Sequence, residues 1–266
     1  MQNFLTKGSV CFVTLDMGFG GAEKVIATLA NEFIQSGRAV TILTLIDQND
    51  FTHALDSRVK LQTLSIKNFK ISFFALCKFI YKNKFDNFIA NIWPLTVFSF
   101  LIRLVYPKTN LVFIEHCILS EQYRDKNIVF KMLQKISITI FYRFANHIIG
   151  VSKGVKNDLI AYGAPKNKIS VIYNPLMPDL ANKNHSVNQD IFDWMQGDHV
   201  NLIAIGQLIK AKNFINLIKS IDLLVNKNKQ KVRLVILGDG LERAAMDESI
   251  KRYNLENSIF LPGWVD

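Results

Sequence analysis

The feature that most limits the fold of this chain is a regular alternation of two kinds of segment. Short apolar and β-branched runs, each about as long as one strand, are separated by longer stretches with the spacing of amphipathic helices. This order is typical of βα units, in which helices cover a parallel sheet. We therefore expect an α/β protein with Rossmann-like, doubly wound parallel sheets. The expected strands are 9–15, 39–46, 59–64, 87–90, 110–114, 147–151, 169–173, 201–205, 233–237 and 258–261, and the expected helices include 21–36, 69–83, 123–144, 214–226 and 242–253.

The alternation is interrupted once, at the stretch Tyr-Asn-Pro-Leu-Met-Pro-Asp over 173–179 and the polar residues that follow it. Proline-containing, polar stretches of this kind mark domain boundaries. A new strand series begins near 201, and only three strands follow before the last residue. We expect an N-terminal domain over 1–174, a linker over 175–199 and an incomplete second domain over 200–266. The chain is then expected to be a fragment or a truncated product.

The net charge of +10 lies mostly in the first part of the chain. Residues 1–180 hold 21 Lys and Arg against 12 Asp and Glu, and the remainder is nearly balanced. Such a surplus favours an anionic partner, which leaves nucleic acid, anionic lipid or a phosphorylated substrate. We find no recognised nucleic-acid motif and expect no nucleic-acid partner.

The cellular compartment is indicated by cysteine spacing and by the N-terminal residues. The three cysteines are far apart and lack metal-type spacing, which favours a reducing, cytosolic compartment. The N-terminus lacks the basic region and apolar run of a signal peptide. The longest charge-free stretch, 87–102, has about 16 residues, fewer than the roughly 20 that a spanning helix needs.

The turn after the first expected strand is rich in glycine, with Gly18, Gly20 and Gly21 ahead of Glu23. Glycines between a strand and a helix let backbone N–H groups approach an anion, and the helix N-terminus favours negative charge. A phosphate or carboxylate is therefore expected there. The dinucleotide fingerprint is nearly met, with Glu23 in place of its third glycine and Asp47 as a candidate for its ribose-binding acid. A nicotinamide-dependent oxidoreductase and a simple tight turn stay open at this point.

A second turn of this kind, 206–213, contains Gly206, Gln207, Lys210 and Lys212 between a strand and a helix. Lysines at a helix start oppose the helix dipole, so they are better placed if they face an external anion. A third loop, Gly-Asp-Gly at 238–240, follows the next expected strand. Each loop taken alone is a weak signal for phosphate binding.

The order of these stretches is more informative than any one of them. Taken together, they resemble glycosyltransferase family 4. The residues that carry the resemblance are Gly-Gly-Ala-Glu-Lys at 20–24, Val-Ser-Lys-Gly-Val-Lys at 151–156, Val-Ile-Tyr-Asn-Pro at 171–175, Gly206 and Leu208 with Lys212 and Asn213, Leu-Gly-Asp-Gly-Leu-Glu-Arg at 237–243, and Phe-Leu-Pro-Gly at 260–263.

The resemblance implies a GT-B architecture, with two Rossmann-like domains that face each other across a cleft. It implies that the C-terminal domain binds most of a nucleoside diphosphate sugar and that the N-terminal domain binds the acceptor. Lys212 then resembles the lysine that neutralises the departing diphosphate. Gln207 stands where the family usually has a partner arginine, so one positive charge is missing. The implied donor-binding residues are Gly20, Gly21, Gly206, Gln207, Lys212, Gly238 and Asp239, and the implied acceptor-side residues are Gly18 and Glu23.

His116 follows an expected strand and should lie at the carboxyl edge of its sheet. The resemblance implies that it contacts the transferred sugar or assists at the reacting centre. A catalytic dyad of His116 with Glu115 or Cys117 is disfavoured, because adjacent strand residues point to opposite faces. No metal or cofactor is implied. The two glutamates with which the family grips the donor would lie beyond Asp266.

The stretch 67–84 holds five lysines and no acid, interleaved with aromatic residues. One reading is a core-facing helix with a solvated basic side. The other is that this side, together with Arg124, Lys126, Lys131 and Lys135, docks the N-terminal domain on an anionic membrane surface. A peripheral protein on the cytoplasmic face of a membrane is then expected.

These observations favour a retaining glycosyltransferase. It would move a hexose or N-acetylhexosamine from a nucleotide sugar to a glycan, with lipid-linked surface polysaccharide as the expected product. The alternatives are the nicotinamide-dependent oxidoreductase and an inactive, truncated, membrane-associated remnant.

Overall fold

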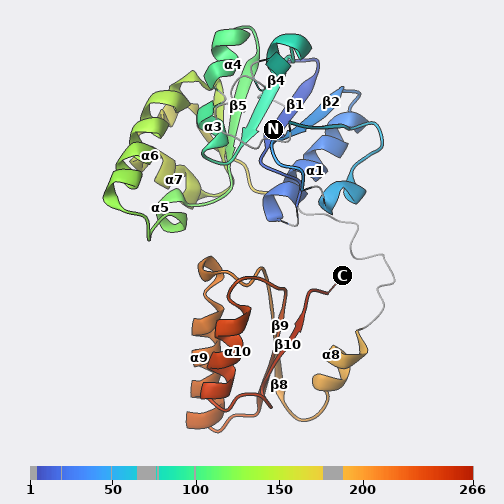
Figure 1. Ribbon diagram of the computed structural model, residues 1–266, viewed down its shortest axis with the longest axis vertical. Helices are drawn as coiled ribbons and strands as arrows, with labels where there is room; N and C mark the ends of the chain where they lie inside the picture. The colour runs from blue at the N-terminus through green and yellow to red at the C-terminus, as the bar shows by residue number, and fades with distance from the viewer. Residues whose placement is uncertain are drawn as a thin grey trace. The chain divides into compact units, whose positions relative to one another are not determined.

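The computed structural model describes residues 5–18, 20–48, 50–64, 76, 78–98, 100–175 and 188–265. The chain divides into two compact units, Met1–Pro178 and Asp179–Asp266 (Figure 1). Each contains its own parallel sheet, as the alternation predicts. Most of the expected basic helix 69–83 lies outside the described residues, and its described part is helical at 76 and 78–83.

The first unit is a seven-stranded, fully parallel sheet in the order β3-β2-β1-β4-β5-β6-β7. The order reverses between β1 and β4, which is the topological switch point of a doubly wound fold. The strands are β1 Val10–Thr14, β2 Val40–Thr44, β3 Lys60–Thr63, β4 Asn87–Asn91, β5 Asn110–Glu115, β6 His147–Gly150 and β7 Ile169–Val171. The helices are α1 Gly21–Gln35, α3 Leu95–Phe98, α4 Phe100–Val105, α5 Leu119–Gln122, α6 Ile128–Phe141 and α7 Lys153–Ala161, with 3-10 turns η2 Asp50–Ala54, η3 Tyr142–Phe144 and η4 Lys166–Lys168.

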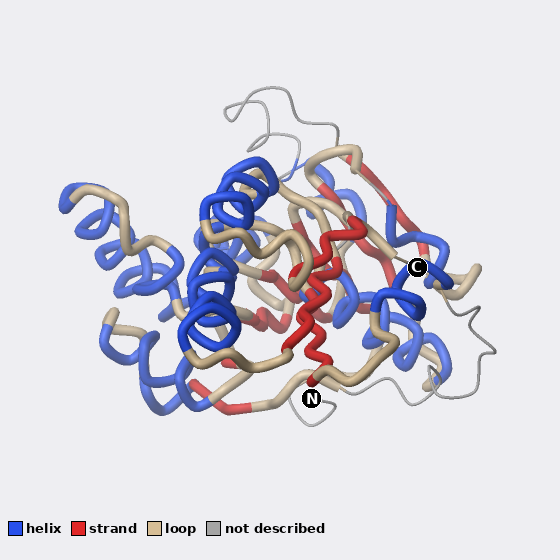
Figure 2. The backbone as a smooth tube through the Cα atoms, turned by 90° about the horizontal axis from the view of Figure 1, so that it is seen from below, coloured by secondary structure: helices blue, strands red, loops and turns tan. Residues whose placement is uncertain are grey.

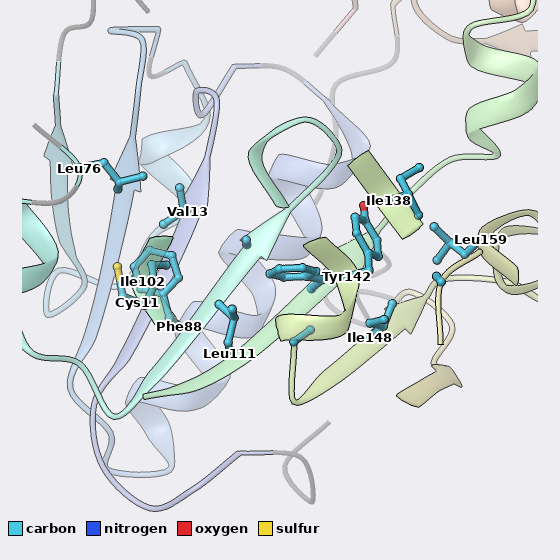
Figure 3. Packing of buried hydrophobic residues seen from close by; sticks show 14 of the residues in the cluster. Cys11, Val13, Leu76, Phe88, Ile102, Leu111, Ile138, Tyr142, Ile148 and Leu159 are labelled. Atoms are coloured by element: carbon cyan, nitrogen blue, oxygen red, sulfur yellow. The ribbon is translucent and has the colours of Figure 1, made fainter. Parts of the chain in front are cut away.

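Alternate residues of β1 enter two different cores. Val10 and Phe12 belong to the cluster that α1 covers, whereas Cys11 and Val13 belong to the cluster on the other face of the sheet. Figure 3 shows this second cluster, to which Phe88 and Leu111 contribute from the strands and Ile138 and Tyr142 from the helical side. Both faces of β1 are therefore shielded from solvent, which explains why the strand sequence is continuously apolar.

The helix expected over 123–144 begins later than predicted. A short helix, α5, ends at Gln122, and α6 starts only after Asn127, whose side chain accepts a hydrogen bond from the N–H of Phe130. Asparagine is a favoured N-cap because its side chain satisfies an N–H that the first helical turn leaves unpaired. The cap fixes the start of the long helix.

The second unit is a three-stranded parallel sheet in the order β10-β9-β8. Alternate residues of β9 again point to two faces: Leu234 and Ile236 pack against α9 and α10, and Arg233 lies over the ring of Trp194 at the end of α8. Figure 2 shows the division of the backbone into strands and helices. The elements are α8 Gln189–Trp194, β8 Val200–Ile205, η6 Lys210–Lys212, α9 Phe214–Asp222, η7 Leu223–Lys227, β9 Val232–Leu237, α10 Arg243–Arg252 and β10 Ile259–Gly263.

The domain boundaries expected from the sequence stay a prediction. The stretch expected as a linker, 175–199, contains α8, whose Asn188 cap accepts a hydrogen bond from the N–H of Ile191. Across the described residues, no helix has the length and apolar character needed to cross a membrane.

At the amino edge of the first sheet, the fully buried Asn87 joins three segments. Its Oδ1 accepts hydrogen bonds from the N–H of Thr6 at 2.8 Å and from Asn110 Nδ2 at 3.0 Å, and its Nδ2 donates to the carbonyl of Thr6 at 2.9 Å. Removing this amide leaves buried donors and acceptors without partners.

We expect Asn87→Ala to lower the free energy of unfolding by about 1–3 kcal/mol, the usual penalty for unsatisfied buried polar groups. The control is Asn157→Ala at an exposed position of α7, which should change it by less than about 0.5 kcal/mol. Urea unfolding measures both. Equal stabilities of the two variants would contradict a structural role for Asn87.

Candidate donor and acceptor sites at the carboxyl edges of the two sheets

Each sheet gathers the loops that follow its strands at one edge, because all its strands run in the same direction. In the first unit the loops after β1, β4 and β5 meet at the switch point. In the second unit the loops after β8 and β9 meet. The residues singled out from the sequence lie in these loops, so each edge is considered separately.

The loop after β1 is held by short backbone contacts. The N–H of Met17 donates to the carbonyl of Gln48 at 2.8 Å, and the N–H of Gly18 donates to Asp16 Oδ1 at 2.9 Å. Gly20 is the N-cap of α1, and Gly21 is the first helical residue, with open space where a Cβ would stand. The helix thus begins as the glycine pattern predicts.

Glu23 lies over the start of α1. A Cβ on Gly20 would stand 2.0 Å from Glu23 Oε2, so the carboxylate occupies the space that a side chain at this position would take. Burial raises the pKa of Glu23, against the effect of its own backbone N–H, and nearby Asp16 raises it further. The carboxylate brings negative charge to the helix N-terminus, where it is favourable.

His116 lies immediately after β5, at the switch point. Its Nε2 is 3.4 Å from Asn91 Oδ1, and the buried Asn91 amide donates to the carbonyl of Val13 at 3.2 Å. Asn91 therefore connects the ends of β1 and β4 to His116. Burial lowers the pKa of His116 to about 4, so the imidazole is neutral at neutral pH. Its buried Nδ1 has no hydrogen-bond partner within the described residues.

A neutral imidazole with one unpartnered nitrogen can donate or accept a hydrogen bond to a substrate hydroxyl. It is a poor general acid near neutral pH, because the protonated form is scarce. The chemistry open to His116 is therefore recognition of a polar group rather than proton donation.

Glu115 is a buried carboxyl next to His116 that the sequence analysis treated only as a disfavoured dyad partner. Its oxygens accept hydrogen bonds from the N–H of Trp93 at 3.2 Å, from Thr96 Oγ1 at 3.3 Å and from the hydroxyl of Tyr142. Cys117 Sγ instead contacts Gln122, and His116 contacts Asn91. The three consecutive side chains thus have different partners, and no dyad forms.

The Glu115 network fixes the loop after β4. Ile92, the first loop residue, has φ 65°, a left-handed conformation that is unfavourable for a β-branched side chain. The N–H of the next residue, Trp93, is held by Glu115. The sequence signal for this role of Glu115 was an acidic residue at the end of an apolar strand. Its partners Thr96 and Tyr142 are too distant in sequence for a local pattern to link them to it.

In the second unit, glycines let the loops after β8 and β9 touch. Gly238 has φ +126°, and a Cβ there would lie 2.1 Å from the carbonyl oxygen of Gly206. The N–H of Leu208 donates to the carbonyl of Asp239 at 2.9 Å. The two loops therefore form one backbone surface at the carboxyl edge of the sheet.

Lys212 lies above this surface. A Cβ on Gly206 would be 3.8 Å from Cδ and Cε of Lys212, so the lysine side chain passes back over that glycine. The lysine is exposed and forms no ion pair within the described residues. Asn213 then turns the chain into α9 with φ 53°. A cation above a glycine-lined surface is suited to a phosphate ligand.

The predicted residues are thus divided between the units. Gly206, Gln207, Lys212, Gly238 and Asp239 lie in the two touching loops of the second unit. The others lie at the switch point of the first unit: Gly18, Gly20, Gly21, Glu23 and His116. Their individual roles stay predictions. Across the residues described by the structure, no group of three or more His, Cys, Asp or Glu side chains is placed to hold a metal ion.

The raised pKa of Glu115 makes a testable contribution to stability. Burial raises it from 4.5 to about 7, although its three donors oppose the shift. The folded state then binds a proton more tightly than the unfolded state. Stability from this group is fully present below about pH 4.5 and is lost as the pH rises to about 7.

Relative to Glu115→Gln, the wild-type chain should lose on the order of 3 kcal/mol of unfolding free energy between about pH 4.5 and 7. Urea unfolding of both proteins across this interval measures the difference. Tyr142→Phe removes a donor to the carboxylate and should move the loss to higher pH. A constant difference between wild type and Glu115→Gln would show that this carboxyl does not titrate in the interval.

Comparison with known proteins supplies relatives over most of the chain. A Campylobacter jejuni protein named N-acetylgalactosamine-N,N'-diacetylbacillosaminyl-diphospho-undecaprenol 4-alpha-N-acetylgalactosaminyltransferase is 28% identical over 93% of this chain and 67% of its own length. The Erwinia amylovora amylovoran biosynthesis glycosyltransferase AmsD is 26% identical over 90% of this chain and 64% of its own length. The chain spans about two thirds of the length of these two relatives.

The fold is shared with solved GT-B glycosyltransferase structures. The crystal structure of Anabaena HepE in complex with UDP-glucose has a TM-score of 0.75 at 18% identity, covering 97% of this chain and 69% of that one. Both units are thus Rossmann-like units of the GT-B type. The family model described as glycosyl transferases group 1 matches residues 195–266. The model described as Glycosyltransferase Family 4 matches residues 19–180, more than half of the sequence, and the chain therefore belongs to glycosyltransferase family 4.

Proposed function

We propose that this chain takes part in the transfer of a hexose or N-acetylhexosamine from a nucleoside diphosphate sugar to a lipid-linked glycan, with retention at the anomeric carbon. The observation that carries the proposal is Lys212 above the touching loops of Gly206 and Gly238. The names of the relatives from Campylobacter jejuni and Erwinia amylovora support transfer in glycan assembly. The reaction is placed on the cytoplasmic face of a membrane, as the basic N-terminal unit suggests.

The domains have separate tasks in this proposal. Residues 1–174 bind the acceptor, 175–199 link the two domains, and 200–266 bind the nucleotide sugar. His116 presents a neutral imidazole to a sugar hydroxyl, since its pKa is lowered to about 4. Gly18 and Glu23 belong to the acceptor side, and Gly20 and Gly21, at the start of α1, belong to the donor site.

The departing nucleoside diphosphate gains negative charge as the glycosidic bond breaks. Lys212 places a positive charge beside it, and the backbone groups of the loops at Gly206, Gly238 and Asp239 are already fixed. Preorganised charge of this kind stabilises a transition state more than it stabilises the bound substrate. Gln207, next to Gly206, supplies a neutral amide where the family resemblance implies an arginine.

A direct test supplies the chain with UDP-N-acetylgalactosamine and a lipid-diphosphate-linked acceptor, and measures sugar transfer. Thermal unfolding with UDP, UDP-N-acetylgalactosamine or NAD gives an independent reading of ligand choice. We expect stabilisation by the uridine nucleotides. Stabilisation by NAD alone would overturn the proposal in favour of an oxidoreductase.

Lys212→Gln should raise the Kd for UDP by about tenfold and lower kcat/KM by about a hundredfold, because the lost charge acts most strongly on the leaving group. The control is Lys219→Gln, an exposed lysine of α9. Calorimetric UDP binding and the transfer assay measure the two effects. If both variants behaved like the wild type, Lys212 would not contact the diphosphate.

Gln207→Arg restores the missing charge and should lower the Kd for UDP by about three- to tenfold at low salt, with a smaller gain at high salt. Calorimetry at two salt concentrations checks this, with Gln207→Met as the uncharged control. A gain that did not depend on salt would point to packing instead of charge.

A further inference from the structure

The solvent side of α6 in the first unit is apolar, which is unusual for a surface helix. Within Ile128–Phe141, six large apolar side chains are exposed, and Ile128 reaches 78%. At 3.6 residues per turn they fall within an arc of about 140°. The residues are Ile128, Val129, Met132, Leu133, Ile136 and Ile140, and we call them the α6 outer face.

Contacts on the opposite side hold α6 in this orientation. Ser137 Oγ accepts a hydrogen bond from Trp93 Nε1 at 3.0 Å. Ile138 is fully buried, and the buried Gln134 accepts from the hydroxyl of Tyr162. A rotation that buried the outer face would break these contacts, so the apolar side is kept outward. Figure 1 shows α6 at the margin of the first unit.

The charges on α6 itself are positive. Lys131 and Lys135 lie at one flank of the arc, and Lys126 precedes the helix, where its Nζ lies 6.0 Å from the ring centre of Phe130. The helix itself contains no acid; the segment before it holds the exposed Asp125 and Arg124, which is within 3.9 Å of Glu121. An apolar helical face bordered by lysines fits an anionic lipid surface. A second copy of this face would bring lysines against lysines.

We propose that the α6 outer face enters the interface of an anionic lipid bilayer and that Lys126, Lys131 and Lys135 contact lipid phosphates. The docking surface is thus the apolar side of α6. This inference specifies which surface of the chain contacts the membrane in the proposed function, and it rests on that function. The helix contacts Trp93, and the N–H of Trp93 contacts Glu115, next to His116. Docking by α6 would therefore bring the membrane close to the acceptor side.

The test measures binding of the 266-residue chain to vesicles, by co-sedimentation. The vesicles contain phosphatidylcholine alone or equal amounts of phosphatidylcholine and phosphatidylglycerol, without acceptor or nucleotide. We expect binding to the mixed vesicles. Because no transfer is measured, failure of this inference and failure of the proposed enzyme activity remain distinguishable.

The double variant Met132→Gln with Ile136→Gln should weaken binding to mixed vesicles by at least about tenfold, since two apolar side chains no longer gain from leaving water. The matched control is Leu223→Gln in the second unit, because Leu223 and Ile136 are both 46% exposed. Circular dichroism checks that the variants are folded. Wild-type binding by the double variant would overturn the proposal.

Replacing Lys126, Lys131 and Lys135 by Gln should remove most of the preference for phosphatidylglycerol. An independent measurement uses Met132→Trp and lipids with brominated acyl chains. These lipids should quench the tryptophan fluorescence of the variant more than that of the wild-type protein. Absence of that quenching would overturn insertion. Sedimentation analysis that showed a dimer, lost in the double variant while vesicle binding was kept, would assign the outer face to a second copy instead.

Discussion

The parallel pairing of buried strands is the constraint on which the rest of this structure depends. The central strands of the first sheet, such as β1, place alternate side chains into two apolar cores. A shift in register by one residue would therefore exchange the side chains of the two faces. The same pairing turns every carboxyl end toward one edge. Loops that are distant in sequence, after β1, β4 and β5, are thereby collected at the switch point, where polar side chains can be used without disturbing the cores.

Polar groups at that edge are stabilised by complete hydrogen bonding. Glu115 is fully buried, yet each of its oxygens has a donor, and the loop at Ile92 is kept in a strained conformation by the same network. A half-satisfied carboxyl at this depth would be costly. His116 differs, because one of its nitrogens lacks a partner within the described residues. The contrast separates a fully hydrogen-bonded carboxyl group from an imidazole with one unpartnered nitrogen.

In the second unit, glycine allows the loops after β8 and β9 to approach each other closely. The loops approach so closely that a side chain at Gly238 would displace the carbonyl group of Gly206, and Lys212 lies over the resulting surface of peptide groups. On the outside of the first unit, α6 shows the opposite arrangement: its inner side makes polar contacts through Ser137 and Gln134, and its solvent side is apolar. Both features depend on local packing that holds a particular side chain outward.

The sequence by itself determined the parallel α/β architecture, because strand and helix periodicities are local and each segment carries its own apolar pattern. It also indicated the family, because the glycine loops can be recognised as short sequence motifs in a characteristic order. Only the tertiary structure decided that Glu115 is held by Thr96 and Tyr142, that Glu23 covers the start of α1, and that the apolar side of α6 faces outward. Those outcomes depend on contacts between distant segments, for which no local pattern in one sequence supplies the partner.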